Sequence, residues 1–145
     1  MKRYKDWLEQ AEKDLNAAQD SEKTQHFEWA CFQAQQSAEK YLKAFLLYLN
    51  IDSWGHGLIH LFQEINQALK GNYEDVDEEP IKEKKALKER CQELDRHYIQ
   101  PRNPNGFASG HPAEYYNKKV AKRCIKYAEY INRFVKEKIE KLSSS

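Results

Sequence analysis

The residue types best suited to chemistry are concentrated in one segment, LDRHYIQPRNPNGFASGHPAEYY, which spans residues 94–116. It contains Arg96, His97, Arg102 and His111. A guanidinium group can hold a phosphate through two parallel hydrogen bonds, and an imidazole can transfer protons near neutral pH. Three prolines and two glycines in the same segment indicate a rigid loop. The segment therefore predicts an active site, a partner surface or a plain connector.

Two arginine–histidine pairs are candidates for catalysis. Arg102 could work with His111 if the loop folds back on itself. Arg90 and His97, with six residues between them, would share one face of a helix and lie about 10 Å apart. In the simpler interpretation, Arg90 is a solvated surface charge and His97 a partly buried polar residue. Arg102 would then satisfy carbonyls at a helix C-terminus or pair with an acidic neighbour.

Other side chains in the segment are candidates for ligand contact. Asn103 is either a contact residue or a turn former before Pro104. The aromatic side chains around the loop could stack on bases, pack the loop onto the protein, or fill a dimer interface, and packing or an interface is favoured. The residues expected to contact a nucleotide, an RNA or a partner are Arg96, His97, Arg102, Asn103 and Tyr116.

The sequence gives little sign of a metal site or cofactor. His56 and His60 have the i, i+4 spacing of a metal pair, but no third ligand is evident nearby, and capping or packing is the favoured role of His56. The three cysteines, Cys31, Cys91 and Cys124, have no CxxC spacing. We therefore expect buried, reduced thiols, with no zinc site and no cofactor.

Composition limits the classes of function. The 145 residues suit one domain, and the formal net charge is +1 although 32% of the residues are charged. This balance argues against a dedicated non-specific nucleic-acid binder, and nothing indicates DNA specificity. The sequence shows neither a signal peptide nor an apolar stretch long enough to span a membrane, so we expect a cytoplasmic protein.

Hydrophobic periodicity predicts only helices. Apolar residues repeat at steps of three and four over residues 3–20, 24–50, 57–70, 81–98 and 113–142, with an acidic linker at 72–80. The longest unbroken pattern, in residues 24–50, predicts a central helix. We therefore predict an all-α, antiparallel up-and-down bundle of four long helices and one short helix. Residues 1–142 would form a single domain, and 143–145 a disordered tail.

Several stretches together resemble one known family. They are WLEQAEKDLNAA from Trp7, HFEWACFQAQQSAEKYLKAFLLYLNI from His26, GHGLIHLF from Gly55, and RHYIQPRNPNG followed by AKRCIKYAEYINRFVKEKI. In order and spacing they resemble the HEPN domain, especially its small stand-alone prokaryotic forms. The resemblance implies a helical bundle that is usually a homodimer. It also implies one of three roles: a metal-independent RNase, a toxin or partner of a small nucleotidyltransferase, or a non-catalytic binding module.

The RNase motif of the resembled family, R-x4–6-H, is not preserved after Arg102. A histidine is expected at position 107, 108 or 109, where the chain has Phe107, Ala108 and Ser109. His111 comes too late for this spacing. We therefore favour a nucleotide-, RNA- or partner-binding module that works with a nucleotidyltransferase in a toxin–antitoxin-type pair. The alternatives are an endoribonuclease that uses Arg102 with His111 or His97, and a structural dimer without a ligand.

Overall fold

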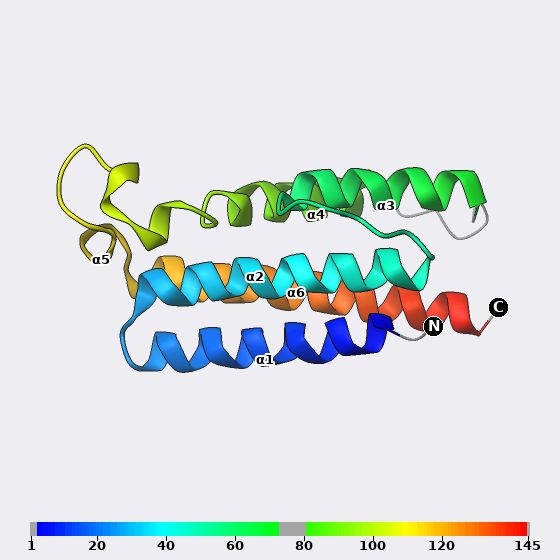
Figure 1. Cartoon of the computed structure of the whole chain (residues 1–145), viewed down its shortest axis with the longest axis horizontal. Coiled ribbons are helices and arrows are strands. Elements are labelled where there is room, and N and C mark those ends of the chain that lie inside the picture. Colours follow the sequence, from blue (N-terminus) through cyan, green and yellow to red (C-terminus); the bar gives the residue numbers. More distant parts are fainter. Residues whose placement is uncertain (1–2, 73–80, 145) are drawn as a thin grey trace.

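The fold is a bundle of α-helices. The computed structural model describes residues 3–72 and 81–144, and these contain helices and no strand. Two helices, α2 (Phe27–Tyr48) and α6 (Lys118–Ser143), form the centre (Figure 1). Helix α1 (Arg3–Lys23) covers one side, and α3 (Leu58–Asn72) and α4 (Ile81–Asp95) cover the other. Helices α1, α2, α4 and α6 alternate in direction, whereas α3 runs the same way as α2, and the predicted all-α bundle is confirmed.

Small side chains bring α1 and α2 close together. Alanines from both helices are fully buried along this contact: Ala11, Ala18, Ala30, Ala34 and Ala38. The Ser37 hydroxyl donates a buried hydrogen bond of 2.7 Å to the backbone oxygen of Ala11. Farther along α2, Tyr41 and Phe45 are also fully buried, as the periodicity predicts. Helix α2 is therefore the centre of the core.

Helix α2 is shorter at both ends than the predicted 24–50. It begins at Phe27, and Gln25 before it has a φ of 67°. At the other end Asn50 has a φ of 65°, a left-handed conformation that asparagine tolerates better than most residues. The amide of Ile51 then donates to the oxygen of Leu46 at 2.8 Å, which closes the helix end. The segment that follows runs back beside the bundle before α3 begins (Figure 1).

Helix α4 ends at Asp95, although the apolar pattern predicts an end at Tyr98. The amide of His97 bonds to the oxygen of Leu94, three residues back, so the chain tightens into a turn. The Asp95 carboxylate accepts hydrogen bonds from the amides of Leu58 at 2.7 Å and Ile59 at 3.2 Å. These amides begin α3 and lack partners within their own helix. Asp95 therefore fastens the end of α4 to the start of α3.

The predicted helix 113–142 is divided in two, and this part of the prediction is wrong. A single turn, α5 (Pro112–Tyr115), is followed by extended backbone at Tyr116 and Asn117. The Asn117 side chain accepts a hydrogen bond of 2.9 Å from the amide of Val120 and so caps α6. Helix α6 continues through Ser143, where the sequence pattern places the start of a disordered tail.

The acidic linker predicted for 72–80 lies, apart from its first position, outside the described residues. Within the described ranges, no helix combines the length and apolar character needed to cross a membrane.

Candidate functional site

Arg102 lies on two aromatic rings. It ends a single 3-10 turn, η1 (Gln100–Arg102), in the loop that projects at one end of the bundle (Figure 1). Its guanidinium carbon is 4.8 Å from the ring centre of Phe32, on α2, and 4.7 Å from that of Tyr98. We call these two rings the Arg102 platform. Each cation–π contact contributes about 0.5–1 kcal/mol at an exposed site.

The guanidinium group of Arg102 remains available to a ligand. The residue is exposed, and among the residues that the structure describes no carboxylate is within ion-pair distance of it. The two rings contact the cation, and its N–H groups make no hydrogen bond to the described residues. Planar N–H donors in this arrangement suit the oxygens of a phosphate.

Further rings extend the platform. His56 is stacked on Tyr98 with 5.0 Å between ring centres and an interplanar angle of 17°. Its Nδ1 is 3.2 Å from the carboxylate of buried Glu39, which also pairs with Lys43. The rings of Trp29 and Phe32 are perpendicular, with their centres 6.0 Å apart, and 43% of Trp29 is exposed. The platform is thus part of a row of rings able to stack on bases.

The loop around Arg102 is held by local contacts. The Asn103 side chain accepts a hydrogen bond of 3.1 Å from the amide of Asn105 and caps the next 3-10 turn, η2 (Pro104–Gly106). This contact supports the turn-forming role of Asn103. Phe107 and Tyr115 stack with their ring centres 4.3 Å apart, which packs the loop against α5. These contacts fix the backbone of the loop that carries Arg102.

His111 is engaged within its own segment. Its Nε2 is 3.1 Å from the Glu114 carboxylate, which also accepts the backbone amide of His111. Across the described ranges, no hydrogen bond or ion pair joins His111 to Arg102. His111 is thus paired with Glu114, and its joint action with Arg102 stays a prediction.

Arg90 and His97 have different partners. The guanidinium carbon of Arg90 lies 4.2 Å from the ring centre of Tyr130 and 5.3 Å from that of Tyr127, both on α6. Its Nη1 also donates to the oxygen of Ala86. His97, which follows α4, is buried beneath the loop. The structure thus shows Arg90 as part of helix packing.

The remaining sequence candidates divide between surface and interior. Arg96 is exposed and lies 3.7 Å from Glu93. His97 and Tyr116 are 7% and 8% exposed, and His97 Nδ1 is 2.8 Å from the Tyr116 hydroxyl. His60 Nε2 lies 3.2 Å from the carboxylate of Glu64, whereas His56 stacks on Tyr98, so the two histidines have different partners. Of the expected contact residues, Arg96, Arg102 and Asn103 are therefore the ones with accessible surface.

Two features escaped the sequence analysis. Trp29 and Phe32 interrupt the buried repeat formed by Cys31, Ala34 and Ala38, and this offset was the sign in the sequence that they lie at the surface. The second feature is a buried group of Cys31, His97 and Cys124, which come together only through the fold. No local spacing in the sequence indicates this group.

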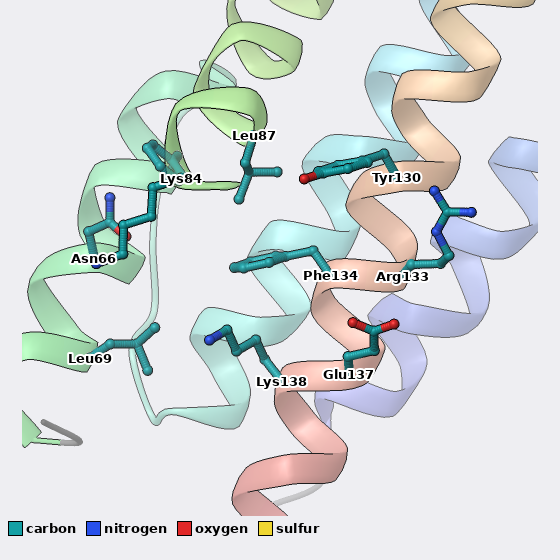
Figure 2. Close-up of a pocket in the computed structure, with 10 residues that line it drawn as sticks. Asn66, Leu69, Lys84, Leu87, Tyr130, Arg133, Phe134, Glu137 and Lys138 are labelled. Atoms are coloured by element: carbon teal, nitrogen blue, oxygen red, sulfur yellow. The ribbon is translucent and has the colours of Figure 1, made fainter. Parts of the chain in front are cut away.

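A separate pocket lies between α3, α4 and α6 (Figure 2). Its volume is about 220 Å³, below the roughly 300–1,000 Å³ of typical small-molecule sites. Apolar side chains such as Leu87 and Phe134 line it together with Lys84, Arg133 and Glu137. Because of this size, we regard the Arg102 platform as the better candidate site.

Comparison with known proteins gives a consistent result. The family model for the HEPN domain matches residues 4–138. A Methanocaldococcus jannaschii protein named Putative toxin MJ1304 is 29% identical over 134 residues, which cover 90% of this chain and 84% of that protein.

Solved structures are similar over nearly the whole chain. TT1696 from Thermus thermophilus is 38% identical with a TM-score of 0.80, covering 95% of this chain and 99% of that one. ST0689, an archaeal HEPN homologue, is 33% identical with a TM-score of 0.73, covering 96% and 99%. The HEPN domain protein TM0613 from Thermotoga maritima is 29% identical with a TM-score of 0.65, covering 90% and 94%.

Proposed function

The chain belongs to the HEPN domain family, and on this premise we propose that it binds nucleotide or RNA phosphates through Arg102. We further propose that it works with a small nucleotidyltransferase in a pair of toxin–antitoxin type. The observation that carries the first part is the exposed guanidinium group on the Phe32–Tyr98 platform. It combines an anion-binding group with rings that can stack on bases.

The toxin–antitoxin context rests on the relative from Methanocaldococcus jannaschii, whose name describes it as a toxin. The surface beside the platform also suits a protein partner. Trp29 is 43% exposed and Ile99 is 57% exposed, and protein interfaces are rich in aromatic residues and arginine. The same surface suits the homodimer that we expect for this chain.

RNA binding tests the role of Arg102 directly. The assay is fluorescence anisotropy of a labelled single-stranded RNA, with ATP as a competing ligand. We expect Arg102→Ala to weaken binding roughly ten- to hundredfold, because a charge-assisted hydrogen bond contributes about 1.5–3 kcal/mol. We also expect a smaller dependence of affinity on salt, since one phosphate contact is lost.

The matched control is Arg133→Ala, which removes an exposed arginine from α6, where its guanidinium carbon is 6.0 Å from the Tyr130 ring. We expect the control to bind like the parent protein. An equal loss of RNA affinity in both variants would mean that any positive charge contributes in the same way, without a specific site at Arg102. Unchanged affinity in Arg102→Ala would contradict the proposal.

The same samples distinguish binding from cleavage. RNA incubated with the protein in EDTA should remain intact, because His111 is paired with Glu114 and the R-x4–6-H spacing is absent after Arg102. Cleavage that disappears in Arg102→Ala would instead establish a metal-independent endoribonuclease. A nucleotidyltransferase encoded beside this gene should copurify with the chain when both are expressed, and its failure to do so would contradict the proposed partnership.

A further inference from the structure

A group of three potential metal ligands lies in the interior, close to the Arg102 platform. Cys31 is on α2, Cys124 is on α6, and His97 follows the end of α4. One donor atom from each of these residues lies within 4.8 Å of those from the other two. Both cysteines are fully buried, and His97 is 7% exposed. We call these residues the Cys–His cluster.

The imidazole ring of His97 is held at one nitrogen, and its other nitrogen lies near a carboxylate. Its Nδ1 is 2.8 Å from the hydroxyl of Tyr116, and their rings meet edge to face. Its Nε2 is buried and makes no hydrogen bond within the described part of the chain. The carboxylate of Glu93 lies 3.6 Å from Nε2, beyond hydrogen-bonding distance. A hydrogen bond at one imidazole nitrogen commonly fixes the ring so that the other can bind a metal.

The two thiols influence each other. Their mutual hydrogen bond lowers the pKa of Cys124 and raises that of Cys31, while burial raises both pKa values. The His97 ring also lowers the pKa of Cys124. Because the thiolate is the metal-binding form of cysteine, both thiols would give up their protons when an ion binds.

We propose that Cys31, Cys124 and His97 bind one thiophilic metal ion, with Zn²⁺ as the ion to test. Two thiolates and an imidazole are ligands that zinc prefers, at about 2.3 Å from sulfur and about 2.0–2.1 Å from nitrogen. Donors on one tetrahedral ion at these lengths are roughly 3.3–3.8 Å apart, so the cluster needs only a small contraction.

The fourth ligand in this proposal is the carboxylate of Glu93. Its distance of 3.6 Å from Nε2 is close to the spacing of two donors on one zinc ion. The Glu93 side chain is 25% exposed and lies 3.7 Å from exposed Arg96, a contact that it would exchange for the ion at the edge of the cluster. Through Glu93 the ion would exchange with solvent although both thiols are buried.

The position of the ion would stabilise the loop end of the bundle. Cys31 directly precedes Phe32, and His97 directly precedes Tyr98. The proposed ion would therefore join α2, α6 and the segment after α4 through residues next in the chain to the two rings that carry Arg102. This inference stands on the cluster alone and does not require the proposed RNA binding.

Zinc stoichiometry tests the proposal. Untagged protein is reduced, stripped of metal, mixed with Zn²⁺, freed of excess ion by gel filtration, and assayed for zinc by mass spectrometry. We expect one Zn²⁺ per chain, and none in Cys31→Ala or Cys124→Ala. The matched control is Cys91→Ala, which removes a third fully buried cysteine, on α4 and outside the cluster, and should retain the ion.

Co²⁺ provides a second measurement that needs no variant. Replacement of Zn²⁺ by Co²⁺ should produce thiolate-to-cobalt charge-transfer absorption and the strong visible bands of a tetrahedral site. Circular dichroism of each alanine variant shows whether it still folds. The proposal is overturned if the parent protein retains no zinc, if folded Cys31→Ala and Cys124→Ala variants retain it, or if the cobalt spectrum lacks the thiolate bands.

Discussion

Arg90 and Arg102 are each held by two aromatic rings, but only Arg102 is free to act on another molecule. The guanidinium of Arg90 lies over Tyr130 and Tyr127, and that of Arg102 over Phe32 and Tyr98. Arg90 comes from a helix, is partly buried and donates to a carbonyl oxygen of its own helix. Arg102 comes from a loop and is exposed.

The comparison shows that a cation–π contact does not by itself define a site. The same geometry holds α4 against α6 in one place and presents a cation in the other. What differs is whether the edge of the guanidinium group is already used. The guanidinium group of Arg90 donates to the oxygen of Ala86, whereas that of Arg102 is exposed and makes no hydrogen bond or ion pair with the described residues.

Removal of Arg90 should change the stability of the protein rather than its affinity for RNA. We expect Arg90→Ala to lower the free energy of unfolding by about 1–2 kcal/mol, because it removes partly desolvated cation–π contacts and the packing of the aliphatic stem. Urea denaturation measures this loss. RNA affinity should stay unchanged, the reverse of the pattern expected for Arg102→Ala. A variant that keeps its stability but loses RNA binding would invert the assigned roles.

Removal of one ring beneath Arg102 gives a smaller effect. We expect Phe32→Leu to weaken RNA binding about two- to fivefold, since it removes one cation–π contact of about 0.5–1 kcal/mol and leaves the guanidinium present. Anisotropy titration measures the change. The matched control is Tyr130→Leu, which removes a ring beneath Arg90 and should lower stability without changing affinity. A loss of affinity with Tyr130→Leu instead would show that the two arginines share one binding surface.

The sequence predicted the helices well because their buried faces repeat at regular steps. The periodicity of Cys31, Ala34, Ala38, Tyr41 and Phe45 identified α2, and all five are fully buried. The division between α5 and α6 was missed because Tyr116 continues the apolar pattern of α6. The boundary is set by the Asn117 side chain, which accepts a hydrogen bond from the amide of Val120. Hydrophobic periodicity does not detect a single cap of this kind.

The candidate site was predicted only in part. Arg102 stood out through its proline-rich setting, but its platform combines residues 32 and 98, which no local pattern connects. The Cys–His cluster was missed for the same reason, since its members are separated by 66 and 27 positions in the chain, from 31 to 97 and from 97 to 124. Metal sites with closely spaced ligands are visible in a sequence, whereas sites assembled by packing are not.

The smallest effect concerns Asp95, which lies between the two arginines in the chain and joins α4 to α3. Burial raises the pKa of Asp95, even though hydrogen bonds from the amides of Leu58 and Ile59 lower it. The folded state therefore keeps the proton of Asp95 to a higher pH than the unfolded state does. Consequently, the contribution of Asp95 to stability falls as pH rises from the ordinary aspartate value, about 3.9, to the raised native pKa, and is level above it.

Asp95→Asn isolates this contribution, because an amide keeps an acceptor for α3 but does not titrate. Urea midpoints of both proteins are measured at a series of pH values from about 4 upward, around the ordinary aspartate pKa. We expect the stability of the parent relative to Asp95→Asn to decline across this window and then become constant. Carboxylates common to both proteins cancel, including Glu22, whose pKa the hydrogen bond with Lys122 lowers. A relative stability that rises with pH would mean that the two amides outweigh burial. In that case the ionised carboxylate of Asp95, through its hydrogen bonds with the amides of Leu58 and Ile59, would stabilise the end of α4.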